Sequence, residues 1–535
     1  MTNPWNFAAA VHRIGGSDLA DRTALIHGDL SLSFADLRQR ALGIATYLAA
    51  KGLPRGAHVG HYMRNSNAYL ESFIGAGLAG LSHVNVNYRY REQELADLCQ
   101  GLDIAVLIFD AEFADRVAAI HDQLPPDTVL IQVGGASDLA DVSLEALYAA
   151  ADPAFEPRAS GDDLILIATG GTTGLPKGTQ WRNEDMWRKL RVCYRGPLEV
   201  LQKQGHPTDM GQHLANVASV GADKPFLSLS PLMHGAGLMM ALAVIGQGGA
   251  VMTLPGKRFD AEVALDAIHD RGVGSLVLVG DAFGLPLAEA ISARGGDAGL
   301  ASLDVVISSG ASLGDASRDA LLGARPDLVI MDTLGSSEAS GYGLSTPEPG
   351  VFLPLPTTRV LDDAFRAVEP GSDTIGMAYA GGNQPIGYYQ EPEKSAETFV
   401  TIAGERYVRT GDRCRVRADG MLVLLGRDST VINTGGEKVY TVEVEVAITT
   451  FPSISDALVI AMPHPRFGKQ VVAVVEGPGL TVDTLDTNAL LNHLSGLLAD
   501  YKIPRHVLVI ESLQRAPNGK PDYAFVTAFA ESQLA

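Results

Sequence analysis

The sequence predicts an α/β protein in which a large N-terminal body of mainly parallel sheets with helices precedes a small α+β C-terminal domain. Strand-like and helix-like stretches alternate from residue 23 to residue 332. From about Val351 to Val423, glycine, proline and short strand-like runs dominate, which indicates a β-rich subdomain of the large body. The chain past Gly426 has the size of a domain, so we expect two domains, 1–426 and 427–535.

Apolar periodicity and turn residues place the elements of the N-terminal body. A helix is expected from Ser33, whose hydroxyl can cap the first turn, with Asp36 three residues further on. A second helix is expected around Asn67–Leu78. The expected strands are Thr23–His27, Leu30–Leu32, Val59–Met63, Ser82–Asn87, Leu164–Thr169, Val273–Val279, Val305–Ser309 and Leu328–Asp332.

The same reasoning places elements in the last third of the chain. The β-rich subdomain is expected to contain strands at Gly376–Tyr379, Arg406–Arg409 and Met421–Leu425. Thr410–Asp412 reads as a tight turn that presents an acid. In the C-terminal domain we expect a helix at Asn488–Leu498 and strands at Ala457–Met462, Val471–Glu476 and His506–Glu511.

Composition excludes several classes of protein. The 535 residues are 46% apolar, which excludes a wholly disordered chain. They carry 41 Lys and Arg against 62 Asp and Glu, a net charge of −21, so binding to nucleic acid is not expected. Cys99, Cys193 and Cys414 lie far apart, which fits a reducing compartment. With no secretion signal at the start, we expect a cytoplasmic protein.

One uncharged segment, Leu238–Leu254, needs comparison with a membrane span. It is slightly short for a span, and Gln247–Gly249 interrupts it. We therefore expect a buried helix, a glycine-rich turn and a buried strand here, and no transmembrane segment.

The strongest local signal is the segment Thr169–Gly178, directly after an expected strand. Backbone N–H groups of such a loop can surround phosphate oxygens, while the hydroxyls add donors and Lys177 adds a cation. It is not a Walker A loop, because Pro176 stands where that motif needs glycine. A surface turn would explain the glycines but not the threonines and the lysine together. The candidate phosphate-binding residues are Thr169, Gly170, Gly171, Thr172, Thr173, Gly174 and Lys177.

A second candidate, Gly310–Gly314, matches GxSxG after an expected strand. That is the context of a nucleophile elbow, so a serine hydrolase using Ser312, with a histidine such as His464, is an alternative function. Small residues here could equally let the chain pass close to a ligand or another strand.

Further candidates are scattered along the chain, and each alone could be an ordinary turn. Asp332–Glu338 ends a strand in small polar groups and a carboxylate that could hold Mg²⁺. Asp412 could accept hydrogen bonds from ribose hydroxyls. Arg427 opens the C-terminal region, and Lys520 stands on a turn near the chain end.

In order, these segments resemble the adenylate-forming superfamily of acyl-CoA synthetases, firefly luciferase and peptide-synthetase adenylation domains. The segments are Thr169–Gly178, Pro231–Gly237, Asp332–Glu338, Arg409–Asp412, Gly426–Glu445, Tyr501–Pro504 and Pro517–Lys520. The resemblance runs from about Asp21 to Lys520. Val84–Tyr90 and Gly178–Trp187 look most like fatty-acyl and steroid-side-chain CoA ligases.

The resemblance implies an AMP-forming acid–thiol ligase that uses ATP, Mg²⁺ and CoA and acts on a hydrophobic carboxylic acid. It implies catalytic roles for Lys520, Glu338 and His234, and metal ligation by Thr169 and Glu338. The residues implied for ATP and AMP are Thr169, Gly170, Gly171, Thr172, Thr173, Gly174, Lys177, Gly310, Ala311, Ser312, Asp332, Gly335, Ser336, Ser337, Asp412 and Arg427. The residues implied to line the path of CoA are Gly435, Gly436, Glu437 and Lys438.

The C-terminal domain is expected to be mobile, since Lys520 must enter the site for adenylation and would obstruct the later approach of a thiol. Ser429 stands at the expected hinge, where the family commonly has Asp or Lys, and Leu334 replaces the usual adenine-stacking aromatic residue. An adenylate-forming enzyme with another acid or acceptor stays open, as does a homodimer.

Overall fold

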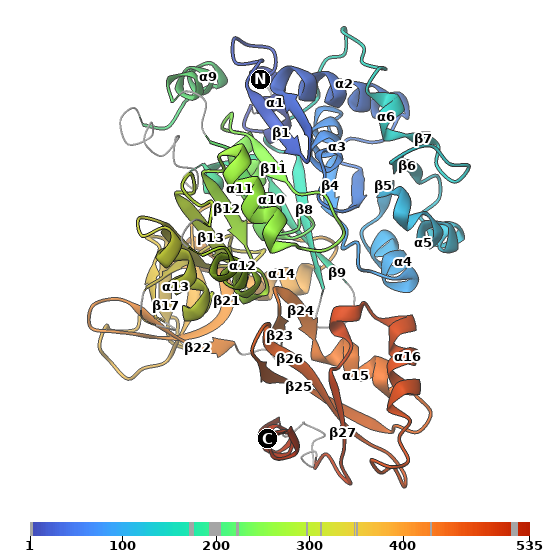
Figure 1. The fold of residues 1–535 in the computed structure, drawn as a ribbon, viewed down its shortest axis with the longest axis vertical. Helices are drawn as coiled ribbons and strands as arrows, with labels where there is room; N and C mark the ends of the chain where they lie inside the picture. Colours follow the sequence, from blue (N-terminus) through green and yellow to red (C-terminus); the bar gives the residue numbers. More distant parts are fainter. Residues whose placement is uncertain are drawn as a thin grey trace.

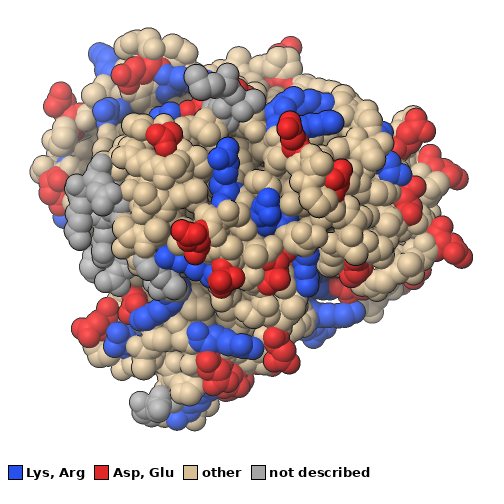
Figure 2. All heavy atoms as spheres, turned by 90° about the horizontal axis from the view of Figure 1, so that it is seen from above, with Lys and Arg blue, Asp and Glu red and all other residues tan. Residues whose placement is uncertain are grey.

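The computed structural model describes residues 4–170, 176–191, 205–220, 224–295, 298–310, 313–346, 348, 351–427, 431–514 and 523–534. Figure 1 shows a large body above and a smaller one beneath it, formed by the elements from β23 onward. On the face seen in Figure 2, acidic and basic side chains are interspersed, and no broad basic field covers it.

An eight-stranded sheet crosses the N-terminal half in the order β19-β9-β8-β4-β3-β5-β6-β7. Strands β3 to β8 pair in parallel, whereas β9 and β19 are antiparallel to their neighbours. The strands are β3 (His58–Tyr62), β4 (Ser82–Asn85), β5 (Ile104–Asp110), β6 (Val129–Val133), β7 (Val142–Ser143), β8 (Leu164–Gly170), β9 (Pro176–Arg182) and β19 (Gly387–Tyr388).

A fourteen-stranded sheet holds the rest of the large body. Its parallel part is β1 (Thr23–His27), β11 (Val251–Thr253), β10 (Phe226–Ser228), β12 (Ser275–Leu278), β13 (Val305–Ser309) and β14 (Val329–Leu334). Its antiparallel part is β2 (Leu30–Ser33), β15 (Gly343–Ser345), β16 (Val351–Pro354), β17 (Thr358–Leu361), β18 (Gly376–Ala380), β20 (Phe399–Ile402), β21 (Glu405–Val416) and β22 (Leu422–Arg427). The predicted β-rich region is thus joined to the parallel strands, because β15 pairs with β14 and β16 pairs with β22.

Helices cover these sheets. The predicted cap of α2 (Phe34–Ala50) is confirmed, since Ser33 and Asp36 form a reciprocal capping box. The uncharged segment forms part of buried α10 (Gly235–Ile245), a turn and β11, and no helix of the described residues is long and apolar enough to cross a membrane. The other helices of the large body are α1 (Phe7–Ile14), α3 (Asn67–Leu78), α4 (Glu92–Gly101), α5 (Ala114–Ala119), α6 (Leu144–Leu147), α7 (Asn183–Leu190), α9 (Met210–Ser219), α11 (Ala261–Arg271), α12 (Asp281–Arg294), α13 (Asp315–Ala324) and α14 (Pro392–Thr398). Two short 3₁₀ helices are η1 (Ala111–Phe113) and η2 (His121–Gln123).

The C-terminal elements have an apolar core of their own, to which Ile432, Val459, Ala473 and Leu490 belong. The strands are β23 (Val431–Thr434), β24 (Glu437–Tyr440), β25 (Asp456–His464), β26 (Gly468–Glu476) and β27 (His506–Val509). The helices are α15 (Thr441–Thr449), α16 (Thr487–Leu497), η3 (Asp500–Lys502) and α17 (Tyr523–Leu534). Figure 1 places α15 and α16 on the same side of the sheet that β25, β26 and β27 form.

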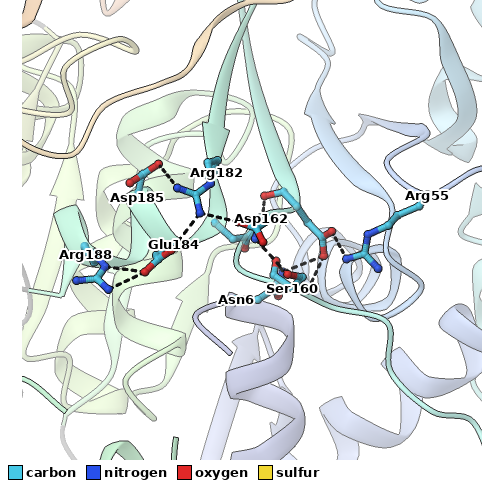
Figure 3. Close-up of polar contacts among 10 residues, drawn as sticks. Asn6, Arg55, Ser160, Asp162, Arg182, Glu184, Asp185 and Arg188 are labelled. Carbon is cyan, nitrogen blue, oxygen red and sulfur yellow. Dashed lines mark hydrogen bonds and ion pairs between the residues drawn. The ribbon is translucent and has the colours of Figure 1, made fainter. Parts of the chain in front are cut away.

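A polar network ties the start of β8 to the N-terminal helix (Figure 3). The Asn6 amide donates to the Ser160 carbonyl oxygen at 2.8 Å, and the Ser160 N–H donates to Asp163 Oδ2 at 2.6 Å. Arg55 forms an ion pair with the same Asp163 carboxylate. At the end of β9, Arg182 pairs with Asp162 at 2.5 Å. Both strands that flank the predicted phosphate loop are therefore anchored at their far ends.

Two histidines lie side by side in the interior between β3, β4 and α3. His61 Nδ1 and His83 Nδ1 are 2.9 Å apart, and both side chains are fully buried. Burial lowers the pKa of His61 from 6.5 to about 4 and that of His83 well below 6.5. The folded state therefore favours the neutral rings.

This pair predicts a loss of stability in mild acid. Above pH 6.5 the rings are neutral in both the folded and the unfolded state. As the pH falls from 6.5 toward about 4, the rings of the unfolded state become protonated while those of the folded state stay neutral, so the free energy of unfolding decreases. Each unit of pKa difference corresponds to about 1.4 kcal/mol. We expect the unfolding midpoint of His61→Asn to fall less steeply over this interval than that of the wild type. Parallel curves would contradict the prediction.

Candidate active site

The ends of the predicted phosphate loop lie on adjacent antiparallel strands. Strand β8 ends at Gly170, β9 begins at Pro176, and Thr169 is the partner of Lys177 in their register. The Thr169 side chain lies outside the described residues, as do Gly171, Thr172, Thr173 and Gly174.

A single aromatic ring links the loop cation to the predicted metal ligand. Lys177 Nζ lies 5.3 Å from the centroid of the Tyr388 ring, and the Tyr388 hydroxyl donates to Glu338 Oε1 at 2.9 Å. Burial lowers the pKa of Lys177, and the nearby charge of Lys394 adds to this effect. A half-buried ammonium and a carboxylate therefore lie at the ring and at the hydroxyl of the same tyrosine.

The segment Gly335–Glu338 directly follows β14. Buried Trp181 of β9 donates its indole N–H to the Ser337 carbonyl oxygen at 2.8 Å, which ties this segment to the other sheet. A Cβ on Gly335 would lie 2.8 Å from the Gly341 nitrogen, so the tight path of the chain requires glycine there.

Asp332 of β14 is held by groups of the protein itself. Its Oδ2 accepts from the Leu313 N–H at 3.3 Å and from Arg318 Nη2 at 3.2 Å. Burial raises the pKa of Asp332, although these two donors oppose the rise. Gly310 follows the neighbouring strand β13 with a φ of +92°, while Ala311 and Ser312 lie outside the described residues.

The expectation of a tight turn at Thr410–Asp412 is wrong. Strand β21 runs without a break through these residues, and Gly411 has a φ of +82°. Between Arg409 and Arg413, three residues of β21 stand opposite one residue of the neighbouring strand β18, as at a β-bulge, which lets an irregular sequence stay in one strand. Asp412 is buried, and its Oδ2 accepts a hydrogen bond from the Tyr342 hydroxyl.

The structure brings one predicted CoA-path residue to the predicted acyl side of the site. Glu437 Oε1 lies 3.0 Å from His234 Nε2 and 2.6 Å from Arg89 Nη1. His234 directly precedes α10, and Glu437 begins β24. Burial raises the pKa of Glu437, but the charges of His234 and Arg89 outweigh burial and lower it to about 2.

Gly435 and Gly436 allow a close approach between the two parts of the chain. The Gly435 N–H donates to the Phe467 carbonyl oxygen at 3.1 Å. Gly436 has a φ of +85°, and a Cβ there would overlap the Val279 side chain, just past the end of β12. Only glycine therefore suits this position in this arrangement. Ser429, Lys520 and the side chains of Arg427 and Lys438 lie outside the described residues.

With this geometry in place, comparison with known proteins decides the family. Residues 16–389 match the family model described as AMP-binding enzyme, and residues 443–520 match the AMP-binding enzyme C-terminal domain. The chain belongs to the AMP-binding enzyme family.

Relatives of this AMP-binding enzyme match nearly its whole length. A medium/long-chain-fatty-acid–CoA/3-oxocholest-4-en-26-oate–CoA ligase of Mycolicibacterium smegmatis is 36% identical over 96% of this chain and 95% of its own. A 3-oxocholest-4-en-26-oate–CoA ligase of Rhodococcus rhodochrous is 35% identical over 94% of this chain and 92% of its own. The amide bond synthetase McbA of Marinactinospora thermotolerans has the same fold, with a TM-score of 0.80, 23% identity and coverage of 98% and 99%.

Sequence analysis missed four side chains that support the predicted site of this AMP-binding enzyme. Tyr388, Trp181, Tyr342 and Arg89 contact Glu338, Ser337, Asp412 and Glu437, respectively. None of the four stands next to its partner in sequence. Arg89 and Trp181 gave a signal, because they belong to the Val84–Tyr90 and Gly178–Trp187 stretches that carry the narrower resemblance.

Proposed function

We propose that this enzyme is an ATP-dependent acyl-CoA ligase that activates a hydrophobic carboxylic acid, of fatty or steroid-side-chain type, through an acyl-adenylate and releases AMP and pyrophosphate. The observation that carries the proposal is the contact of Glu437 with His234, beside which Gly436 lies against Val279, just past the end of β12. The names of the two full-length CoA-ligase relatives support the same activity.

The first step replaces a poor leaving group on the acid with AMP. Its transition state needs cations where charge develops on the phosphates. Lys177 and the amides of the loop after β8 would hold the β- and γ-phosphates, and Lys520 would draw the acid oxygen to the α-phosphorus. Asp412 would bind the ribose hydroxyls, with Arg427 assisting, and Ser337 would contact the α-phosphate.

One carboxylate of this site, that of Glu338, is of the kind that Mg²⁺ prefers as a ligand. The Glu338 carboxylate lies at the Tyr388 hydroxyl, opposite Lys177, and Mg²⁺ prefers carboxylate and phosphate oxygens. Glu338 and Thr169 would hold the ion. Bound there, the ion would neutralise charge on the phosphates.

The second step is attack of the CoA thiol on the acyl carbonyl. Gly435 and Gly436 would border the path of the thiol, beside His234 and Glu437. Because Glu437 is ionised over the ordinary pH range, it would hold the orientation of the His234 ring.

Helix α10, which His234 directly precedes, suits a hydrophobic acid. Helix α10 carries no charged residue, and its side chains are mostly buried. At Gly235 a Cβ would come no nearer than 3.8 Å to Ile167, so glycine leaves space here that neighbouring side chains do not fill.

A panel of carboxylic acids tests the proposal directly. Medium- and long-chain fatty, steroid-side-chain and aromatic acids would each be scored for ATP–pyrophosphate exchange and for CoA-dependent AMP formation. We expect exchange with hydrophobic acids and thioester formation only with CoA present. Exchange without transfer to CoA would point to another acceptor. Absence of exchange, with fluorophosphonate labelling of Ser312 and loss of an esterase activity, would favour the hydrolase.

Tyr388→Phe is expected to slow adenylation more than thioester formation. The change removes the hydrogen bond to Glu338 but keeps the ring beside Lys177. A hydrogen bond to a charged group is worth about 1.5–3 kcal/mol, so we expect a loss of roughly tenfold or more in pyrophosphate exchange. Tyr389→Phe, which loses an exposed hydrogen bond to Asp103, is the matched control. Equal rates of pyrophosphate exchange for the wild type and Tyr388→Phe would show that the Tyr388 hydroxyl has no role in adenylation.

A further inference from the structure

One short segment of the large body meets one short helix of the C-terminal part. Asn87 Nδ2 donates to the Tyr501 hydroxyl at 3.2 Å, Arg91 pairs with Asp500 at 3.0 Å, and Glu94 pairs with Lys502 at 2.6 Å. All three partners belong to η3. In Figure 1, α4, which contains Glu94, lies at the lower edge of the large body.

The pair of Glu94 and Lys502 differs from the other ion pair because it is buried. The side chains of Lys502 and Glu94 are 4% and 11% exposed, whereas that of Asp500 is 83% exposed. The Lys502 ammonium also lies 5.1 Å from the centroid of the Tyr90 ring. An exposed ion pair contributes little to the stability of the docked state. A buried ammonium destabilises that state unless an opposite charge compensates its loss of hydration.

A carboxylate of the large body contributes to the compensation of the Lys502 charge. Glu94 Oε1 accepts from the ammonium, while Glu94 Oε2 accepts from the N–H of Arg91, the residue just before α4, which fixes the carboxylate. If the C-terminal part rotated away, both charges would return to water. The two charges are therefore stabilised either by each other in this docked orientation or by water after undocking. In a docked but shifted orientation of the C-terminal part they would have neither.

We infer that Glu94 and Lys502 are positioning residues for thioester formation: their buried ion pair fixes the one docked orientation in which Glu437 reaches His234. The inference rests on the proposed function and extends it to the control of its second half-reaction. Buried ion pairs add little net affinity but penalise misalignment, so this pair specifies the orientation without locking the enzyme in it.

The test separates the two half-reactions in full-length Glu94→Gln, Lys502→Met and the double variant. Adenylation is followed by ATP–pyrophosphate exchange, and transfer by mixing pre-made acyl-adenylate with CoA in a single turnover. Each single change removes one charge of this buried pair, so we expect transfer to slow about tenfold or more while exchange changes less than about twofold. Arg91→Gln, which breaks only the exposed pair, should change neither rate by more than about twofold.

The double variant gives a signature that general damage would not produce. It removes both charges, so its transfer rate should exceed that of either single variant. Equal slowing of both half-reactions, unchanged transfer in the single variants, or a double variant slower than both would overturn the inference. If the wild type itself neither exchanges pyrophosphate nor forms a thioester, the proposed function fails instead, so the two failures can be told apart.

Discussion

Lys520→Ala is expected to slow acyl-adenylate formation by a factor on the order of 10²–10⁴, the range for losing a positioned cation in the transition state. The assignment rests on the place of Lys520 in the Pro517–Lys520 motif. Lys520 would hold the acid oxygen against the α-phosphorus, and the second step does not use this contact. Transfer from pre-made acyl-adenylate to CoA should therefore stay near the wild-type rate.

The comparison of half-reactions decides this prediction. Pyrophosphate exchange and single-turnover transfer would be measured on the same preparation of Lys520→Ala. Equal losses in both would mean that the change disturbs the C-terminal domain and that Lys520 has no specific role in adenylation.

Gly436→Ala should have the opposite signature. In the docked arrangement its Cβ would overlap Val279, and the φ of +85° is unfavourable for alanine. The segment that contains Glu437 would then be displaced from His234, and a displacement of about 1 Å can cost on the order of 10² in rate. We expect a loss of this size in thioester formation, with pyrophosphate exchange largely retained.

Gly479→Ala is the matched control for this change. Gly479 also has a positive φ, +68°, but a Cβ there meets nothing within 4 Å. It therefore carries the same kind of backbone strain without the overlap. Similar kinetics in both variants would attribute the effect to strain and contradict a role for the close approach at Gly436.

Sequence reasoning succeeded where structure depends on local pattern. Helix α3 and strand β13 match their predicted bounds, because an apolar run, a cap and a turn residue are readable in one short window. It failed at β21, which runs from Glu405 through Thr410 and Gly411 to Val416. Pairing of the flanking residues with β18 and β22 keeps Thr410 and Gly411 within one strand, and neither partner strand is visible in the local sequence.

The candidate site shows the same division. The motifs predicted which segments lie at strand ends: Thr169 is one residue from the end of β8, and Gly335–Glu338 follows β14. They did not predict the contacts of Tyr388, or the meeting of Glu94 with Lys502. These pairs are brought together by packing between distant elements, and a single sequence carries no signal of which distant side chains meet.

The hydrogen bond between Trp181 and Ser337 has an optical consequence. The chain has three tryptophans, and two of them, Trp5 and Trp187, lie against each other with ring centroids 5.8 Å apart. The third, Trp181 of β9, donates its hydrogen bond to the segment after β14 that is proposed to contact the nucleotide. Indole emission responds to changes in its hydrogen bond and surroundings, so a Trp5→Phe/Trp187→Phe enzyme would report occupation of that segment by its own fluorescence, without an attached dye.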